Sequence, residues 1–270
     1  MSKCKTLGII SIKGGVGKTT TVINLAASLA NDYRKKVLVV DANFSSPNVN
    51  LHLGSVDHKT NLHDVLKNKA NIANAVYDHE FGFHFIPSAL IVNEKVNYLS
   101  LKHKLAGLKK YYDFIVIDSS PSLNDEILAT ISASDELYVV SSPDLPTLST
   151  TLRAAKLAKQ KGARIEGLIL NKVRGKKYEI PKKDMEELTG IPVLTVINDN
   201  PRVLESLSKV KPITLHSPNS NVSREYKRLA AALCGENYKE PSLLVKAAAY
   251  LKDDFNNFVS HDFKKNFKYY

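Results

Sequence analysis

The sequence of 270 residues contains no tryptophan and only two cysteines, Cys4 and Cys234. Two cysteines cannot build a framework of several disulfides, and they offer no CxxC pair for a metal ion or an iron–sulfur cluster. The sequence has no N-terminal hydrophobic segment of the signal-peptide type, and no run approaches the roughly 18 apolar residues of a membrane-spanning helix. These absences predict a reduced, cytoplasmic setting.

Acidic residues are also scarce, since 27 Asp and Glu against 38 Lys and Arg give a formal net charge of +11. Such an excess attracts polyanions, either nucleic acid or anionic lipid, although ordinary solvated lysines explain the same number equally well. Hydrophobic residues make up 43% of the chain, which is enough for a folded core. The length fits one large α/β domain or two small ones.

Residues 7–26 read LGIISIKGGVGKTTTVINLA, which is the order strand, glycine-rich turn and helix. The three glycines of the turn are Gly14, Gly15 and Gly17. They let the backbone wind tightly, so that several N–H groups converge on one anion at the start of a helix. Lys18 supplies a positive charge for the β- and γ-phosphates, and the Thr19 hydroxyl can ligate Mg²⁺. The stretch therefore predicts a site for ATP and Mg²⁺.

The strict P-loop pattern G-x-x-x-x-G-K-[ST] requires glycine at position 12, where this chain has Ile12. The motif present is K-G-G-V-G-K-T, which begins with an additional lysine, Lys13. On this deviant Walker A motif, the chain resembles the MinD/ParA family of P-loop ATPases, and it is most similar to MinD-like proteins. The resemblance implies that Lys13 crosses an ATP-bridged homodimer and contacts the phosphates bound by the second subunit.

Two later strand-like runs each end in an aspartate. Residues 36–40 and 112–117 are continuous apolar runs typical of strands buried on both faces of a parallel sheet, and Asp41 and Asp118 follow them. An acidic residue closing such a strand is the Walker B pattern, which orients water on Mg²⁺. The resemblance implies that Asp41 also holds Mg²⁺ through water and that Asn48 helps to position the attacking water.

One position departs from the family. Asn43 stands where the family usually has a second aspartate that is tied to hydrolysis. An amide cannot accept a proton as a carboxylate does, so its use as a base is lost. Phosphoryl transfer depends mainly on positioning and charge neutralisation, so we expect hydrolysis to persist but to be slow or stimulated by an unidentified protein partner.

The adenine base is expected beside the later strands. Asn171 closes the run 165–170 and, with the lysine after it, resembles the base-reading element of related nucleotide hydrolases; a simple turn asparagine is the alternative. The resemblance also places residues 198–201 next to adenine. The expected catalytic residues are Lys13, Lys18, Asn43 and Asn48. The expected nucleotide-binding residues are Gly14, Gly15, Val16, Gly17, Lys18, Thr19, Thr20, Asn171 and Pro201. The expected Mg²⁺ ligands are Thr19, Asp41 and Asp118.

Strand-like runs alternate with helix-like segments, which predicts an α/β fold with a doubly wound, mainly parallel β-sheet flanked by helices. Strands are expected at residues 7–10, 36–40, 83–86, 112–117, 136–140, 165–170 and 192–197. Helices are expected after the glycine-rich turn, at residues 61–66, 94–110 and 217–233, and in 141–162 with Thr147 or Ser149 as its cap. The resemblance covers about residues 5–233, so we expect a P-loop ATPase domain at 1–235.

The remaining residues 236–270 are expected to form a helical extension. From residue 242 onward, apolar side chains recur every three to four positions, which predicts an amphipathic helix. MinD proteins carry a C-terminal amphipathic helix that binds membrane, so the resemblance implies a lipid role. The aspartates and asparagines among its lysines favour instead a helix that docks on protein.

Together these features predict an ATPase that acts as an ATP-dependent dimerisation switch and positions a cellular cargo by cycling on a surface. The surface is either the inner face of the membrane or nucleoid DNA, and the basic loop at residues 172–183 is the best local candidate for a polyanion contact. Asn43 leaves open a nucleotide-bound scaffold that barely hydrolyses ATP. A bacterial-type tyrosine kinase is a remoter alternative, because only Tyr269 and Tyr270 form its C-terminal tyrosine cluster.

Overall fold

The computed structural model describes residues 3–90 and 96–240. Its strands are β1 (Lys5–Ile10), β2 (Val37–Ala42), β3 (Tyr77–Asp78), β4 (His84–Ile86), β5 (Phe114–Ser119), β6 (Glu136–Ser141), β7 (Ile165–Val173) and β8 (Val193–Asn198). They form a sheet in the order β3-β4-β2-β5-β1-β6-β7-β8. All pairings are parallel in this part of the chain except that of β3 with β4. The predicted doubly wound, mainly parallel sheet is confirmed.

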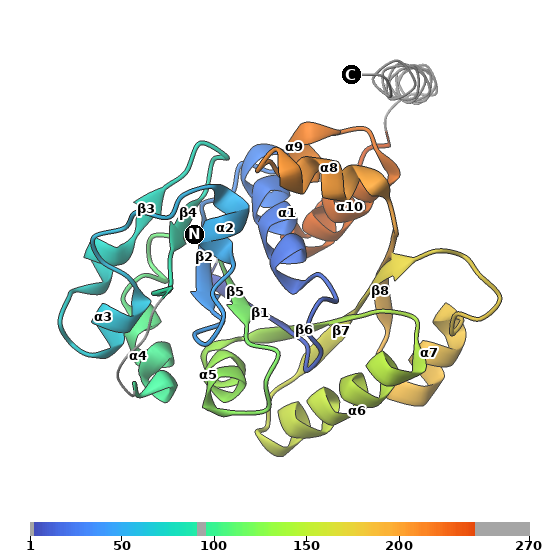
Figure 1. Cartoon of the computed structure of the whole chain (residues 1–270), viewed down its shortest axis with the longest axis horizontal. Coiled ribbons are helices and arrows are strands. Elements are labelled where there is room, and N and C mark those ends of the chain that lie inside the picture. Colours follow the sequence, from blue (N-terminus) through green and yellow to red (C-terminus); the bar gives the residue numbers. More distant parts are fainter. Residues whose placement is uncertain (1–2, 91–95, 241–270) are drawn as a thin grey trace, which may run out of the picture.

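Helices cover both faces of the sheet. They are α1 (Lys18–Asn31), α2 (Val49–Leu53), α3 (Leu62–Leu66), α4 (Leu101–Ala106), α5 (Asp125–Ala133), α6 (Leu145–Gln160), α7 (Lys182–Thr189), α8 (Pro201–Ser208), α9 (Ile213–His216) and α10 (Asn221–Cys234). Two 3₁₀ turns are η1 (Ile72–Ala75) and η2 (Tyr98–Ser100). Figure 1 shows α1, α9 and α10 on one side of the strands and α5, α6 and α7 on the other.

Strand β2 shows why the chain folds into two layers of helices around one sheet. Val37 and Val39 pack in the cluster with α1 and α10, whereas Leu38 and Val40 pack in the cluster with α3, α4 and α5. All four side chains are buried, and full burial of each contributes about 1.5–3 kcal/mol. An apolar run without alternation is therefore what a strand covered on both faces requires.

The predicted helix at residues 94–110 is confirmed only in part over the described part of that segment. The chain forms the 3₁₀ turn η2 and then the short helix α4, which ends at Ala106 with Gly107 as its C-cap. Leu101 and Leu105 are buried, but Leu99 is 48% exposed. The spacing of apolar residues is satisfied by a 3₁₀ turn and a short helix in succession, so periodicity alone overstated the length of one helix.

The predicted cap of α6 is also wrong. Asp144 is the N-cap, and its Oδ1 accepts a hydrogen bond from the backbone N of Thr147 at 2.9 Å. Thr147 is thus inside the first turn, and Ser149 lies further along the helix. Asp caps as well as Ser or Thr do, and here it stands directly before the Leu-Pro start.

The short helix predicted at 61–66 is confirmed as α3, where Asn61 and Asp64 form a reciprocal capping box. The helix expected at 217–233 begins at Asn221 instead, after the N-cap Ser220. The amphipathic helix predicted at residues 242–270 lies outside the described residues. Over the part that is described, no helix is both long enough and apolar enough to cross a membrane.

Candidate functional site

The glycine-rich loop joins β1 to α1 at the carboxyl edge of the sheet, where open α/β folds bind ligands. Gly17 has a φ of +97°, and a Cβ added there would lie 2.3 Å from Asn171 Nδ2. Gly15 also has a positive φ, of +75°. A Cβ at Gly14 or Gly15 would meet no atom within 4 Å, so open space lies beside this part of the loop. The loop is tightly wound and leaves room for an anion, as the sequence predicted.

Lys18 is the first residue of α1, and its side chain folds back over the loop. Its Nζ lies 3.4 Å from the carbonyl oxygen of Lys13, to which it donates. Only 7% of Lys18 is exposed, and this burial lowers the pKa of its ammonium, while the nearby charge of Asp118 partly restores it. A phosphate at the loop would compensate the cost of keeping this charge out of water.

Two buried carboxylates lie behind the loop. Asp41 and Asp118 stand opposite each other in the register of β2 and β5, and neither is exposed to solvent. Asp41 accepts backbone N–H bonds from Asn43, Asn48 and Val49, each at 3.1 Å. Asp118 Oδ2 accepts from the Thr19 hydroxyl at 2.6 Å, whereas its Oδ1 is buried without a hydrogen-bond partner.

The predicted ligand set for Mg²⁺ fits this geometry. Mg²⁺ is usually held by one or two carboxylates together with phosphate and water oxygens, and Asp118 Oδ1 is a buried acceptor that lacks any donor. Burial raises the pKa of Asp118 to about 6, and burial together with the charge of Asp118 raises the pKa of Asp41 well above its usual range. Among the described residues, no group of three or more His, Cys, Asp or Glu is placed to hold a metal. A cation at this site would therefore need nucleotide or water oxygens in addition to the side chains of Thr19, Asp41 and Asp118.

The raised pKa of Asp118 predicts how stability depends on pH. Between about pH 4 and pH 6 the folded protein holds a proton on Asp118 that the unfolded chain has released, so the contribution of Asp118 to stability falls as pH rises and levels off above about 6. Asp118→Asn should remove this loss and stabilise the nucleotide-free protein at pH 8 by about 2–3 kcal/mol. Thermal unfolding in EDTA at pH 4, 6 and 8 measures it. Equal stability of Asp118→Asn and wild type at pH 8 would contradict the prediction. The control is Asp125→Asn, which removes an exposed carboxylate and should unfold as wild type does.

The additional lysine of the motif is held by the start of α6. Lys13 Nζ lies 3.0 Å from Asp144 Oδ1 and 2.6 Å from Thr147 Oγ1. Burial raises the pKa of Asp144, but hydrogen bonds from Ser142 and Thr147 and the contact with Lys13 bring it down to about 2. Asp144 is therefore ionised at neutral pH. No local pattern in the sequence indicates this contact, although an aspartate just before Leu-Pro is a recognisable helix start.

Asn43 and Asn48 lie in the β2–α2 loop (residues 43–48), which follows Asp41. Asn43 Nδ2 donates a short hydrogen bond to the carbonyl oxygen of Ser46, and its buried Oδ1 has no partner. Asn48 Nδ2 donates to the same carbonyl at 2.7 Å. Both amides thus hold the loop in shape, and both border the cleft that leads to the P-loop.

A cleft of about 630 Å³ extends from the glycine-rich loop to α8. The predicted site residues that line it are Gly14, Gly15, Gly17, Lys18, Thr19, Thr20, Asn43, Asn48 and Asn171. Towards β8 and α8 the cleft is lined by the apolar residues Ile197, Val203, Leu204 and Leu207 together with the polar residues 198–200. A phosphate-type loop at one end and apolar side chains with a few polar groups at the other match the chemistry of a nucleotide.

Strand β7 holds the glycine-rich loop at two points. Asn171 Nδ2 donates to the carbonyl oxygen of Val16 at 2.8 Å, which leaves Asn171 Oδ1 as an acceptor. Lys172 Nζ donates to the carbonyl oxygen of Gly15 at 2.7 Å. The sequence named Lys172 only as the neighbour of Asn171 and as part of the basic loop, so its contact with the glycine-rich loop is new information.

The remaining predicted residues lie around the cleft without lining it. The side chain of Val16 is buried, with 2% of the residue exposed, and its carbonyl oxygen accepts the hydrogen bond from Asn171. Pro201 opens α8 directly after Asn200, the N-cap, and residues 198–200 line the cleft. Lys13 is turned toward α6 instead, as described above.

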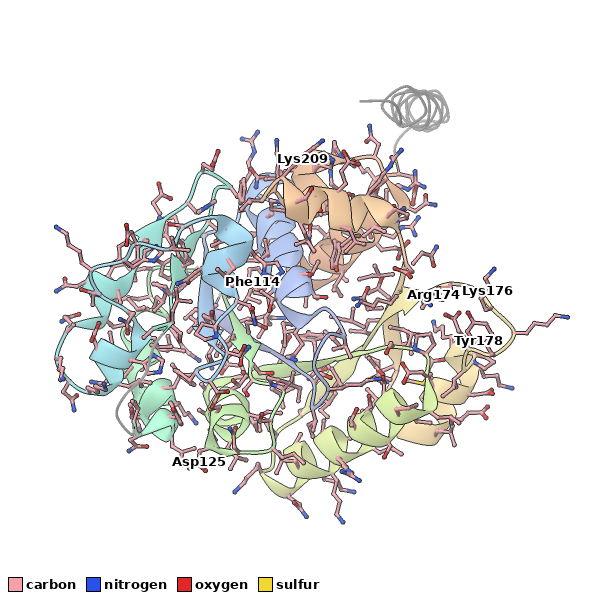
Figure 2. The ribbon with its side chains drawn as sticks, in the orientation of Figure 1. Phe114, Asp125, Arg174, Lys176, Tyr178 and Lys209 are labelled. Atoms are coloured by element: carbon pink, nitrogen blue, oxygen red, sulfur yellow. The ribbon has the colours of Figure 1, made fainter. Side chains whose placement is uncertain are left out.

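The basic loop at 172–183 is partly neutralised by its own acidic neighbours. Arg174 Nε lies 2.7 Å from Asp199 Oδ2, and Glu179 accepts from the backbone N of Lys176 at 3.1 Å. Tyr178 is 76% exposed. Figure 2 shows Arg174, Lys176 and Tyr178 at the outer edge of the molecule beside α7. The polyanion contact stays a prediction.

A strand, a glycine-rich loop and a helix on a doubly wound parallel sheet define the chain as a protein of the P-loop α/β class. Comparison with known proteins narrows this class. Residues 4–160 match a family model described as an AAA domain. An uncharacterised ATP-binding protein of Methanocaldococcus jannaschii is 30% identical over 256 residues, which cover 94% of this chain and 93% of that protein.

Solved structures agree with this assignment. MinD of Pyrococcus horikoshii complexed with Mg-ADP superposes with a TM-score of 0.80 at 30% identity, covering 85% of this chain and 96% of that one. The cell division ATPase MinD of Pyrococcus furiosus gives a TM-score of 0.81 at 30% identity, covering 86% and 98%. This chain therefore belongs to the MinD/ParA family of P-loop ATPases.

Proposed function

We propose that this protein is an ATP-dependent dimerisation switch that positions a cellular cargo by cycling on a surface. The observation that supports this most is the pair of lysines in one glycine-rich loop. Lys18 lies over the loop, whereas Lys13 is directed away from the cleft of its own subunit toward Asp144. A lysine whose side chain does not line the nucleotide cleft of its own subunit is suited to contact the nucleotide of a second subunit.

The residues of the cleft support ATP as the ligand. In this proposal the loop amides and Lys18 bind the phosphates, and Thr19, Asp41 and Asp118 hold Mg²⁺, which when bound neutralises charge on the β- and γ-phosphates. Asn171 Oδ1 accepts from the amino group of adenine, because Asn171 Nδ2 already donates to Val16. Guanine presents an acceptor at that position, so the fixed amide favours adenine.

Hydrolysis in this proposal is slow. Asn48 lines the cleft, and in this proposal its side chain orients the attacking water molecule. Asn43 lies beside it and offers an amide oxygen in place of a carboxylate, so neither residue can remove a proton from that water. Turnover then depends on positioning and on charge neutralisation by Lys18, and in the dimer by Lys13 of the second subunit.

The switch predicts a nucleotide-dependent change of assembly. Wild-type protein should elute as a dimer in size-exclusion chromatography with ATP and Mg²⁺, and as a monomer without nucleotide. Lys13→Ala should stay monomeric with ATP while still binding it, because Lys13 does not line the cleft of its own subunit in the part of the chain described here. A monomer under every condition, or a dimer of the variant, would refute the switch.

The surface and the domain limits remain part of the proposal. We propose an ATPase domain at residues 1–235 and an extension at 236–270 that contacts protein or lipid. Arg153, Lys156 and Lys159 are exposed on α6 and add positive charge to that of the 172–183 loop. Membrane or DNA would be attracted to such a surface through its phosphates.

A second candidate function is a nucleotide-bound scaffold, and Asn43 favours it. The amide of Asn43 is used to hold Ser46 and carries no charge, so the ATP-bound state could persist without turnover. Phosphate release that stays at background in the presence of DNA, lipid vesicles and cell extract would support the scaffold over the switch.

A further inference from the structure

Glu126 is a buried acid for which the proposed reaction has no use. It lies in the first turn of α5 and is 4% exposed. Its Oε2 accepts hydrogen bonds from the backbone N of Ser45 at 3.1 Å and from Ser45 Oγ at 3.2 Å. Its Oε1 accepts one from Asn124 Nδ2 at 3.2 Å. These three donors give each carboxylate oxygen at least one hydrogen bond, as a buried polar group requires.

Ser45 belongs to the β2–α2 loop, which also carries Asn43 and Asn48. The neighbouring Phe44 is buried, with its ring 5.3 Å from that of His63 and stacked 4.4 Å from that of Tyr98. This loop is therefore attached to the protein by an aromatic contact at Phe44 and by hydrogen bonds at Ser45. The hydrogen bonds lead to α5, in the segment that follows Asp118.

The other end of the contact lies on that segment. Residues 120–124 connect β5 to α5, and Asn124 is the N-cap of α5. Asn124 Oδ1 accepts from the backbone N of Glu126 at 3.1 Å, which fixes its Nδ2 toward the Glu126 carboxylate. Glu126 thus joins the β2–α2 loop to α5, and it lies 81 positions after its partner Ser45 in the chain.

We propose that Glu126 is a positioning residue that holds the β2–α2 loop against α5 and thereby keeps Asn43 and Asn48 in place for ATP hydrolysis. The inference rests on the proposed ATPase. Glu126 acts through Ser45 and touches neither the nucleotide nor the reacting atoms. The β2–α2 loop, which follows Asp41, and the segment 120–124, which follows Asp118, are then held in a fixed position relative to each other.

The substitution Glu126→Gln tests this contact with little change of volume. An amide oxygen can accept from Ser45 or from Asn124, but its NH₂ group must then face the other donor. Because a charge-assisted hydrogen bond is lost, amide exchange in the peptide spanning 43–48 should become about tenfold faster, as measured by deuterium uptake and mass spectrometry. The matched control is Asp125→Asn, which removes the same charge from the same helix at an exposed position (Figure 2).

The kinetic readout separates positioning from binding. Glu126→Gln should lower kcat about tenfold and leave KM for ATP within about twofold, because the phosphate loop is untouched and the β2–α2 loop is displaced. Asp125→Asn should match wild type in both. If Glu126→Gln does not fold in a thermal melt, Ser45→Ala removes the hydroxyl bond alone, and about a threefold fall in kcat is then expected.

Two results overturn the inference: exchange at 43–48 equal to that of Asp125→Asn, or a kcat unchanged while exchange rises. A wild-type protein that neither binds nor hydrolyses ATP overturns the proposed function instead. The exchange measurement needs no nucleotide, so it still decides whether Glu126 holds the loop.

Discussion

Replacing Lys18 by alanine should abolish measurable ATP binding. In the structure, this ammonium is buried at the glycine-rich loop with one carbonyl as its acceptor. Charge-assisted hydrogen bonds contribute about 1.5–3 kcal/mol each, so losing contacts to two phosphates corresponds to a fall in affinity of at least about 100-fold. Titration calorimetry with ATP and Mg²⁺ measures the effect.

The control is Lys161→Ala, which removes the same charge from an exposed residue that does not line the cleft. This variant should bind ATP as wild type does. Because Lys18→Ala leaves the buried Asp118 without its nearby cation, a thermal melt of the variant accompanies the titration and should show a folded protein. Affinity within tenfold of wild type for Lys18→Ala would contradict the placement of the phosphates at this loop, and with it the proposed function.

The second large effect is expected for Gly17→Ala. At a φ of +97°, a Cβ is strained, and it would lie 2.3 Å from the Asn171 amide that holds the loop. Left-handed backbone costs about 1–2 kcal/mol for a residue with a Cβ, and overpacking costs about 1–3 kcal/mol more. We therefore expect a loss of about 2–5 kcal/mol in the free energy of unfolding, together with weakened ATP binding.

Gly14→Ala is the matched control for this substitution. A Cβ at Gly14 meets no atom within 4 Å, and its φ is not positive. Urea denaturation without nucleotide should therefore give wild-type stability for Gly14→Ala and a clearly lower midpoint for Gly17→Ala. Equal urea midpoints for the two variants would contradict this prediction. They would mean that the Asn171 amide can move away from a Cβ at position 17 without loss of stability.

The sequence predicted those parts of the site that local rules determine. Asp41 and Asp118 were found because apolar runs without alternation imply buried parallel strands, whose ends meet at one edge. Lys18 and Thr19 were found because a glycine-rich turn before a helix has few other uses. The neighbouring elements β1, β2 and β5 have nearly the expected bounds for the same reason.

Other features depend on contacts that no local pattern encodes. Helix α2 has five residues and β3 has two, which is too short for any periodicity to appear. Helix α8 was missed because its apolar residues face the cleft, and Ser206 is its buried side chain, the reverse of the usual amphipathic pattern. The Lys13–Asp144 and Ser45–Glu126 contacts join residues 131 and 81 positions apart. Such pairs become visible only when the sheet order is known.

The two bonds from β7 have a consequence for nucleotide exchange. Because Asn171 and Lys172 bind the carbonyl groups of Val16 and Gly15, the protein's own side chains hold the glycine-rich loop in shape. A preorganised receptor loses little conformational entropy on association. Discrimination among nucleotides should then reside in how long each one stays, not in how fast it enters.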